Sequence, residues 1–143
     1  MATTATITIS SDIGMGESVS KTMTLTKAGA LTDIEETTGF SRRKLAATTA
    51  VDLITMANEL VEPSDNTAAK VYIQNIGDGK GNVYKSTYVT VSIGDTGGTT
   101  QQVGRLYGGD WLMMPATVVD DMDIVVAPST NDAVVLEYTM FYE

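Results

Sequence analysis

Apolar and polar residues alternate with a period of two along much of the chain, which is typical of β-strands with one buried face. The segment Thr4–Ile9 reads T-A-T-I-T-I, and in residues 19–26 the apolar side chains of Val19, Met23 and Leu25 share one face. Threonines occupy the opposite face of that second run. Both runs therefore predict strands.

The same alternation continues through the rest of the chain, between turns rich in glycine, asparagine, aspartate and proline. A glycine-rich turn at residues 77–82 predicts a β-hairpin between the strands on either side of it. The last two strands are likewise predicted to pair with each other. The expected strands are residues 44–49, 51–56, 70–76, 83–93, 101–107, 111–114, 123–127 and 133–142. Pro115 is expected to end the strand at residues 111–114, because proline lacks the N–H donor of a ladder.

A helix competes with a strand only in residues 50–60, where Val51 and Ile54, together with Leu53, Ala57 and Leu60, could make a helical stripe. About eight short strands at regular spacing predict an all-β fold, an antiparallel β-sandwich of jelly-roll type with an extended N-terminal arm. A chain of 143 residues has the size of one domain. We therefore expect a single sandwich domain over residues 1–143, with residues 1–16 as a possible arm.

Composition excludes more functions than it indicates. The chain has 9 basic and 18 acidic residues, so its net charge of −9 should repel the phosphate backbone of nucleic acids. It contains no histidine and no cysteine, which removes disulfides, thiolate nucleophiles, Cys/His zinc sites and Ser-His-Asp triads. Neither a signal peptide nor a membrane-spanning run is visible, so we expect no membrane contact.

Two segments contain residues that suggest a binding site, but neither matches the full motif. Asp120, Asp121 and Asp123 have the oxygen ligands that Ca²⁺ prefers, but the glycine and the twelfth-position glutamate of an EF-hand loop are absent. The glycines of residues 77–81 lack the spacing of a phosphate-binding loop. No G-x-S-x-G or H-E-x-x-H motif occurs. We therefore predict no metal, no cofactor, no catalytic residue and no enzymatic activity.

Trp111 is the only tryptophan and follows a glycine-rich turn. An aromatic side chain in such a place can stack on a sugar, which suggests a carbohydrate-binding module. The plainer expectation is that Trp111 packs into the core or fills a subunit interface, where tryptophan is enriched. Methionines are numerous and are expected to fill gaps in the core or in an adaptable contact surface: Met56, Met113, Met114, Met122 and Met140.

The N-terminal strand is short and is followed closely by Gly14 and Gly16, so its own domain anchors it poorly. Such a strand is suited to pair with the sheet edge of a neighbouring copy. One hypothesis is that it makes intersubunit contacts in which Ile7 and Ile9 are buried. The other is that it pairs within its own sandwich.

Two groups of segments carry a resemblance to a known class of proteins. Residues 18–29 resemble an opening strand in small virion proteins of tailed phages, particularly marine phages that infect cyanobacteria. Residues 70–76, which contain an asparagine, are followed by the R-L-x-x-G-D turn of residues 104–111 and by an aromatic closing strand at residues 136–143. This order resembles small β-sandwich structural proteins of phage particles.

The resemblance implies a virion location and work done by surfaces, with no catalytic residue. The expected function is that of a capsid decoration or cement protein, which stabilises the shell through protein–protein contacts. A tail, neck or fibre component is the alternative within the particle. The implied partners are further copies of the chain, in a homo-oligomer, and the major capsid protein or another virion protein.

Overall fold

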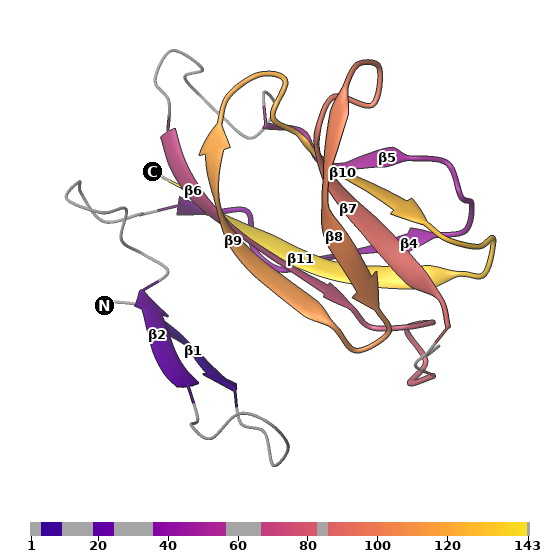
Figure 1. Cartoon of the computed structure of the whole chain (residues 1–143), viewed down its shortest axis with the longest axis horizontal. Coiled ribbons are helices and arrows are strands. Elements are labelled where there is room, and N and C mark those ends of the chain that lie inside the picture. The colour runs from indigo at the N-terminus through magenta and orange to yellow at the C-terminus, as the bar shows by residue number, and fades with distance from the viewer. Residues whose placement is uncertain (1–3, 10–18, 25–35, 57–66, 83–85, 143) are drawn as a thin grey trace.

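The computed structural model describes residues 4–9, 19–24, 36–56, 67–82 and 86–142, and these contain eleven β-strands and no α-helix (Figure 1). The strands are β1 (Thr4–Ile9), β2 (Val19–Thr24), β3 (Glu36–Thr37), β4 (Ser41–Leu45), β5 (Val51–Ile54), β6 (Thr67–Asn75), β7 (Tyr88–Gly94), β8 (Thr100–Tyr107), β9 (Trp111–Val118), β10 (Ile124–Pro128) and β11 (Val134–Tyr142).

Strands β3 to β11 form two antiparallel sheets that pack face to face as a sandwich (Figure 1). One sheet has the order β5-β10-β7-β8; the other has the order β3-β11-β6-β9, and β4 also pairs with β11. With β4 placed beside β11, the eight strands β4 to β11 have the sheet order of a jelly roll. The predicted fold class is therefore confirmed.

Alternating side chains from both sheets fill the space between them. On β6, Val71 and Ile73 are fully buried, while Tyr72 and Gln74 lie on the outer face of the sheet. The fully buried apolar side chains of the core include Met56, Val71, Ile73, Val89, Val91, Val118, Ile124, Val126, Val134, Leu136 and Met140. This burial follows the period of two that the sequence shows.

Both predicted pairings between consecutive strands are wrong, although the strands themselves exist. β6 pairs with β9 and β11, whereas β7 pairs with β8 and β10, so the turn at residues 77–82 crosses from one sheet to the other. β10 and β11 also belong to different sheets. In a jelly roll most connections bridge the two sheets; here only β7 and β8 are consecutive neighbours within the sandwich.

Pro115 does not end a strand as predicted. β9 continues through it to Val118, with Pro115 opposite Lys70 of β6. β9 lies at the end of its sheet and pairs with β6 alone. A proline on such an edge strand removes no ladder hydrogen bond, provided that its nitrogen faces away from the partner strand.

The strand predicted at residues 44–49 lies earlier in the chain. β4 covers Ser41–Leu45, and residues 46–49 form no strand and are exposed. The cause is the partner, since β4 pairs with β11 from Ser41 opposite Tyr138 to Leu45 opposite Val134, where β11 begins. Within the candidate helix at residues 50–60, residues 51–54 form strand β5, and residues 57–60 lie outside the described part of the chain.

Strands β1 and β2 form an antiparallel two-stranded sheet of their own, which Figure 1 shows beside the sandwich. Thr4 lies opposite Thr24, and Ile9 lies opposite Val19. Among the described strands, β1 is therefore paired with β2 and with neither sandwich sheet. The side chains of Ile7 and Ile9 lie outside the described part of the structure, and their burial against a neighbour stays a prediction.

Two glycines in the β7–β8 hairpin have opposite surroundings. Gly94 has a φ of +135°, and a Cβ atom there would lie 2.3 Å from the carbonyl oxygen of Thr99 and 2.9 Å from the Cα of Thr100. Gly104 has ordinary strand geometry, and no heavy atom lies within 4 Å of the place its Cβ would take. Only the first position therefore requires glycine.

We expect Gly94→Ala to lower the free energy of unfolding by about 3 kcal/mol, because backbone strain and overlap with fixed backbone atoms add together. Gly104→Ala is the matched control, and should be neutral or stabilise by about 0.5 kcal/mol through the unfolded chain. Urea unfolding of the two variants measures both effects. Equal stabilities of the two variants would contradict this account of the hairpin.

Candidate functional site

Three aromatic side chains form a row on the outer face of the β3-β11-β6-β9 sheet. The rings of Phe40 and Tyr72 are 6.0 Å apart at an interplanar angle of 74°, and those of Tyr72 and Trp111 are 6.3 Å apart at 34°. Phe40 is 69% exposed and Trp111 is 45% exposed. We call these three residues the aromatic row. The rings of Tyr72 and Trp111 are therefore neighbours whose planes are tilted to each other.

Phe40 is held by the short segment that precedes it. The N–H of Thr38 donates to the carbonyl of Met140, and the N–H of Met140 donates to the Thr38 hydroxyl, each at 3.0 Å. The Thr37 and Thr139 hydroxyls are 3.2 Å apart, and Gly39 turns the chain with a φ of +72°. These bonds fasten the segment to β11, so Phe40 is exposed without being loosely attached.

A buried asparagine at the end of β6 holds the turn that precedes Trp111. Asn75 has no exposed surface; its amide nitrogen donates to the Leu106 carbonyl at 3.0 Å, and its side-chain oxygen accepts from the Gly77 N–H at 3.0 Å. Its backbone exchanges two further bonds with the β8–β9 turn, from Gly109 N–H at 2.8 Å and to the Asp110 carbonyl at 3.0 Å. We call this set of bonds the Asn75 junction. It fixes the turn from which Trp111 begins β9.

Polar groups border the aromatic row. The Tyr72 hydroxyl donates to Oε1 of Gln74 at 2.9 Å, which leaves the Gln74 amide nitrogen as a donor at the edge of the row. Nε of Arg42 donates to Oε2 of Glu137 at 2.8 Å, so these two charges offset each other. Burial, and then the charge of Glu137, raise the pKa of Tyr72, which stays a neutral phenol at pH 7. The row is an aromatic surface with planar hydrogen-bonding groups beside it.

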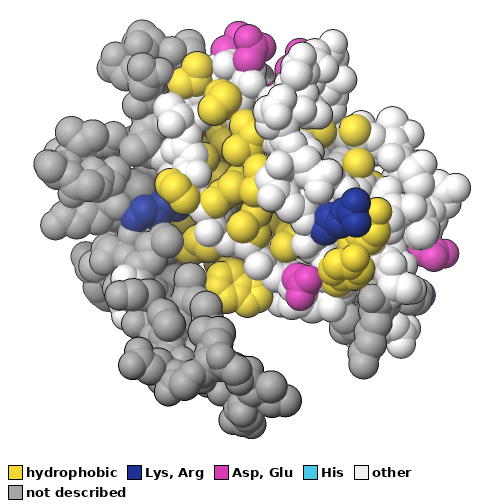
Figure 2. All heavy atoms as spheres, viewed as in Figure 1, with side chains coloured by type: hydrophobic (Ala, Val, Ile, Leu, Met, Phe, Trp, Pro, Cys, Tyr) yellow, Lys and Arg dark blue, Asp and Glu magenta, His cyan; other side chains and the backbone are white. Residues whose placement is uncertain are grey.

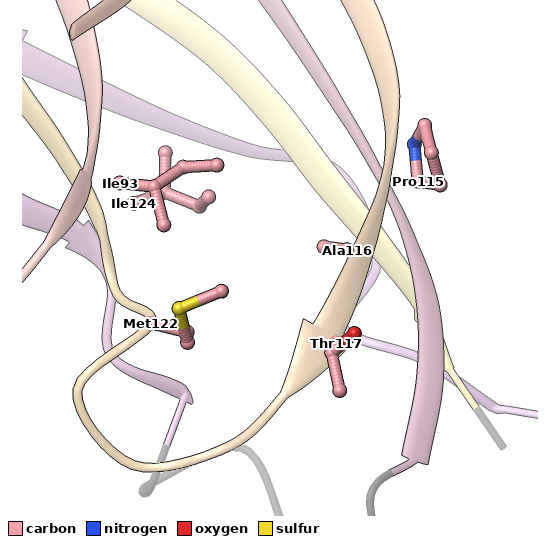
Figure 3. Close-up of a pocket in the computed structure, with 6 residues that line it drawn as sticks. All are labelled: Ile93, Pro115, Ala116, Thr117, Met122 and Ile124. Carbon is pink, nitrogen blue, oxygen red and sulfur yellow. The ribbon is translucent and has the colours of Figure 1, made fainter. Parts of the chain in front are cut away.

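An apolar groove of about 230 Å³ opens at the seam between the two sheets (Figure 3). Ile93 of β7 and Ile124 of β10 face β9 across it, and Met122 lies on the loop that follows β9. The remaining lining residues are Pro115, Ala116 and Thr117 of β9. Figure 2 shows hydrophobic side chains gathered on this face between β9 and β8. The groove carries no ionisable side chain, so it offers contact area and no acid–base chemistry.

The acidic residues after β9 do not act as a group. Asp120 and Asp121 are exposed, whereas Asp123 is only 8% exposed and accepts a 2.7 Å hydrogen bond from the N–H of Met56. Burial raises the pKa of Asp123, against that hydrogen bond, and the charges of Asp52, Asp95 and Asp120 add to the rise. Among the described residues no cluster of three carboxylates is placed to hold a metal ion.

The structure brings together some predicted residues and separates others. Trp111 is half-exposed, so its expected packing into the core is wrong, while its role in an interface stays a prediction. Met56, Met114 and Met140 are in the core as predicted, and Met122 is 43% exposed at the groove. The sequence analysis missed Phe40. No local pattern marks it, because the aromatic row joins three segments that are distant in sequence.

Comparisons with known proteins give only distant similarities. No protein-family model matches the sequence, and no curated protein matches it. A solved structure of the Bacillus endospore appendages, described as a novel family of disulfide-linked pili, is 18% identical with a TM-score of 0.45, over 81% of this chain and 96% of that one. The CBM22-1 xylan-binding domain of Paenibacillus barcinonensis Xyn10C is 11% identical with a TM-score of 0.28, over 99% and 84%. Both TM-scores are below 0.5, and we infer nothing about function from either.

The Asn75 junction makes a strong prediction for stability. Asn75→Ala leaves the Leu106 carbonyl and the Gly77 N–H buried without their partner. We therefore expect the free energy of unfolding to fall by about 3 kcal/mol and Tm to fall by about 10 °C. Gln74→Ala, one residue earlier on the outer face, is the control and should cost less than about 1 kcal/mol. Calorimetry of both variants tests this, and similar Tm values would refute the junction's importance.

Asp123 makes a prediction with a defined pH dependence. Its pKa in the folded state is raised above the unfolded value, so its contribution to stability is full below the unfolded pKa and is lost as the pH rises through the folded pKa. Asp123→Asn keeps an acceptor for the Met56 N–H and removes the buried charge. We therefore expect its Tm to exceed that of the native chain by a few degrees at pH 7, and the difference to vanish near pH 3.

The control for this experiment is Asp121→Asn, which removes the same charge from an exposed position. Asp121 has a φ of 69°, a conformation that asparagine tolerates well. The difference between the Tm of Asp121→Asn and that of the native chain should vary much less with pH than the corresponding difference for Asp123→Asn. A lower Tm for Asp123→Asn at pH 7 would mean that the hydrogen bond to Met56 outweighs the cost of burying the charge.

Proposed function

We propose that this protein is a structural subunit of a tailed-phage particle, a capsid decoration or cement protein that acts through protein–protein contacts and not as an enzyme. The observation that carries the proposal is the open apolar groove at the seam of a sandwich whose N-terminal hairpin lies outside both sheets. Jelly rolls are used in viral capsids, and this fold is compatible with such a role. A tail, neck or fibre component is the alternative position in the particle.

Within this function, we assign the groove to strand β1 of a neighbouring copy. Ile7 and Ile9 are two residues apart, so a strand presents them to the same side, and the groove is lined by apolar side chains. A hairpin of two strands alone is marginally stable in water, so packing against a neighbour would stabilise it.

Charge favours the same assignment. The described strands of the hairpin carry one charged residue, Lys21, which lies opposite Ile7. The loop that bears the groove residue Met122 carries exposed Asp120 and Asp121 beside it. A hairpin with a positive charge therefore meets an acidic rim, and opposite charges across a contact select the partner and its orientation.

Membranes and nucleic acids are two other classes of partner. No helix in the described residues is long and apolar enough to cross a membrane. The net charge of −9 disfavours nucleic acid as a partner. The partners that we propose are further copies of the chain and the major capsid protein, or another virion protein.

Deleting residues 2–11 tests the proposal. We expect the full-length chain to be a homo-oligomer that binds virus particles prepared without it, and the deletion variant to lose either its oligomeric state or its attachment while its Tm changes little. Light scattering and co-sedimentation with the particles measure the two properties. If the deletion variant unfolds, the arm belongs to the core and the assignment is wrong.

A point variant in the groove should reproduce the effect of the deletion. Met122→Glu places a charge at the half-exposed edge of the groove, beside two aspartates. We expect it to lower the molecular mass measured by light scattering toward that of the monomer. Ser86→Glu adds the same charge at an exposed position that does not line the groove, and should leave the mass unchanged. A full-length chain that is monomeric and does not bind particles would contradict the proposal.

A further inference from the structure

The aromatic row is a second surface, separate from the groove, and the contacts around it indicate a ligand. Trp111 and Tyr72 place two rings side by side at 34°, and Phe40 stands at 74° to Tyr72. The three rings are thus consecutive neighbours on one face of the sheet, each tilted relative to the next. The bonds to β11 and the Asn75 junction hold both ends of the row in place before any ligand arrives.

We propose that the aromatic row binds a neutral glycan, made of pyranose units whose hydroxyl groups are equatorial. Such a sugar presents flat C–H faces that stack on aromatic rings, and its hydroxyls project sideways from the ring. In this structure polar side chains border the aromatic row. The Gln74 amide nitrogen is a donor, and the carboxylate of Glu137 has acceptor sites beyond its bond to Arg42.

The charges around the row favour a neutral glycan over an acidic one. Arg42 is paired with Glu137 at 2.8 Å, so this part of the face offers no unbalanced guanidinium for an anionic sugar. The chain as a whole has a net charge of −9, which repels polyanions. A neutral sugar needs no unpaired guanidinium and is not repelled by the net negative charge.

The size of the row favours a glycan over a protein partner. A fully exposed aromatic side chain offers about 150–250 Å², and Phe40 and Trp111 are 69% and 45% exposed while Tyr72 is exposed less, so the three rings together supply roughly 400 Å² at most. A stable protein–protein interface buries about 800 Å² on each partner. The row is therefore small for a protein interface, and its length of three rings suits a short run of sugar units.

The single tryptophan of the chain gives a direct readout, because all tryptophan fluorescence comes from Trp111. An array of neutral and acidic glycans identifies the bound sugar; cellohexaose, xylohexaose and N-acetylchitohexaose are then titrated into the full-length protein. We expect at least one neutral sugar to produce a saturable change in emission. Tyr72→Ala should weaken that binding at least tenfold. Trp111→Ala should weaken it by a similar factor, and because this variant has no tryptophan, its binding is measured by calorimetry.

Tyr107→Ala is the matched control, since Tyr107 is also a partly exposed aromatic residue but belongs to strand β8 of the other sheet. It should leave glycan binding unchanged. The Tyr72 and Trp111 variants should keep the native mass in light scattering, which separates this inference from the assembly proposed for the groove. If no neutral glycan binds, if only acidic ones bind, or if the row variants alter the mass instead, the proposal is wrong.

Discussion

The hydrogen bonds of one buried side chain determine how the outer surface of the sandwich is built. Asn75 has no exposed surface, and both halves of its amide are satisfied, by Leu106 at the end of β8 and by Gly77 after β6. A buried amide is costly unless every partner is present, so this arrangement accepts few alternatives. It ties β6 to the β8–β9 turn and so fixes the register in which Gln74 lies opposite Trp111. Tyr72 and Trp111 become neighbours as a consequence.

The described surface divides into regions with different physical character. The inner faces of both sheets are committed to the core. The groove is apolar and lies at the seam, where one sheet ends in the edge strand β9. The aromatic row lies on the outer face of a sheet, bordered by hydrogen-bonding side chains. The proposed assembly through the groove and the proposed ligand binding through the aromatic row are therefore separable by single substitutions.

The sequence predicted the strands well because alternation is a local property. Val71, Ile73 and Asn75 are buried on β6 as their period of two indicates. It predicted pairing poorly, because a jelly roll sends most connections across to the other sheet, and a glycine-rich turn looks the same in a hairpin and in such a crossing. Pro115 was misjudged for a related reason, since only the sheet order shows that β9 is an edge.

The candidate site was even less accessible to prediction. Trp111 was recognised as a candidate, but Phe40 and Tyr72 join it only through the pairing of β6 with β9 and the attachment of the segment before β4 to β11. Native-state amide hydrogen exchange tests the central claim most directly, through the amides of Asn75, Gly77 and Gly109. If the Asn75 junction belongs to the core, these three amides exchange only through global unfolding, as that of Val91 should. Exchange of the three at a free energy far below that of Val91 would show that the junction opens locally, and would contradict the account.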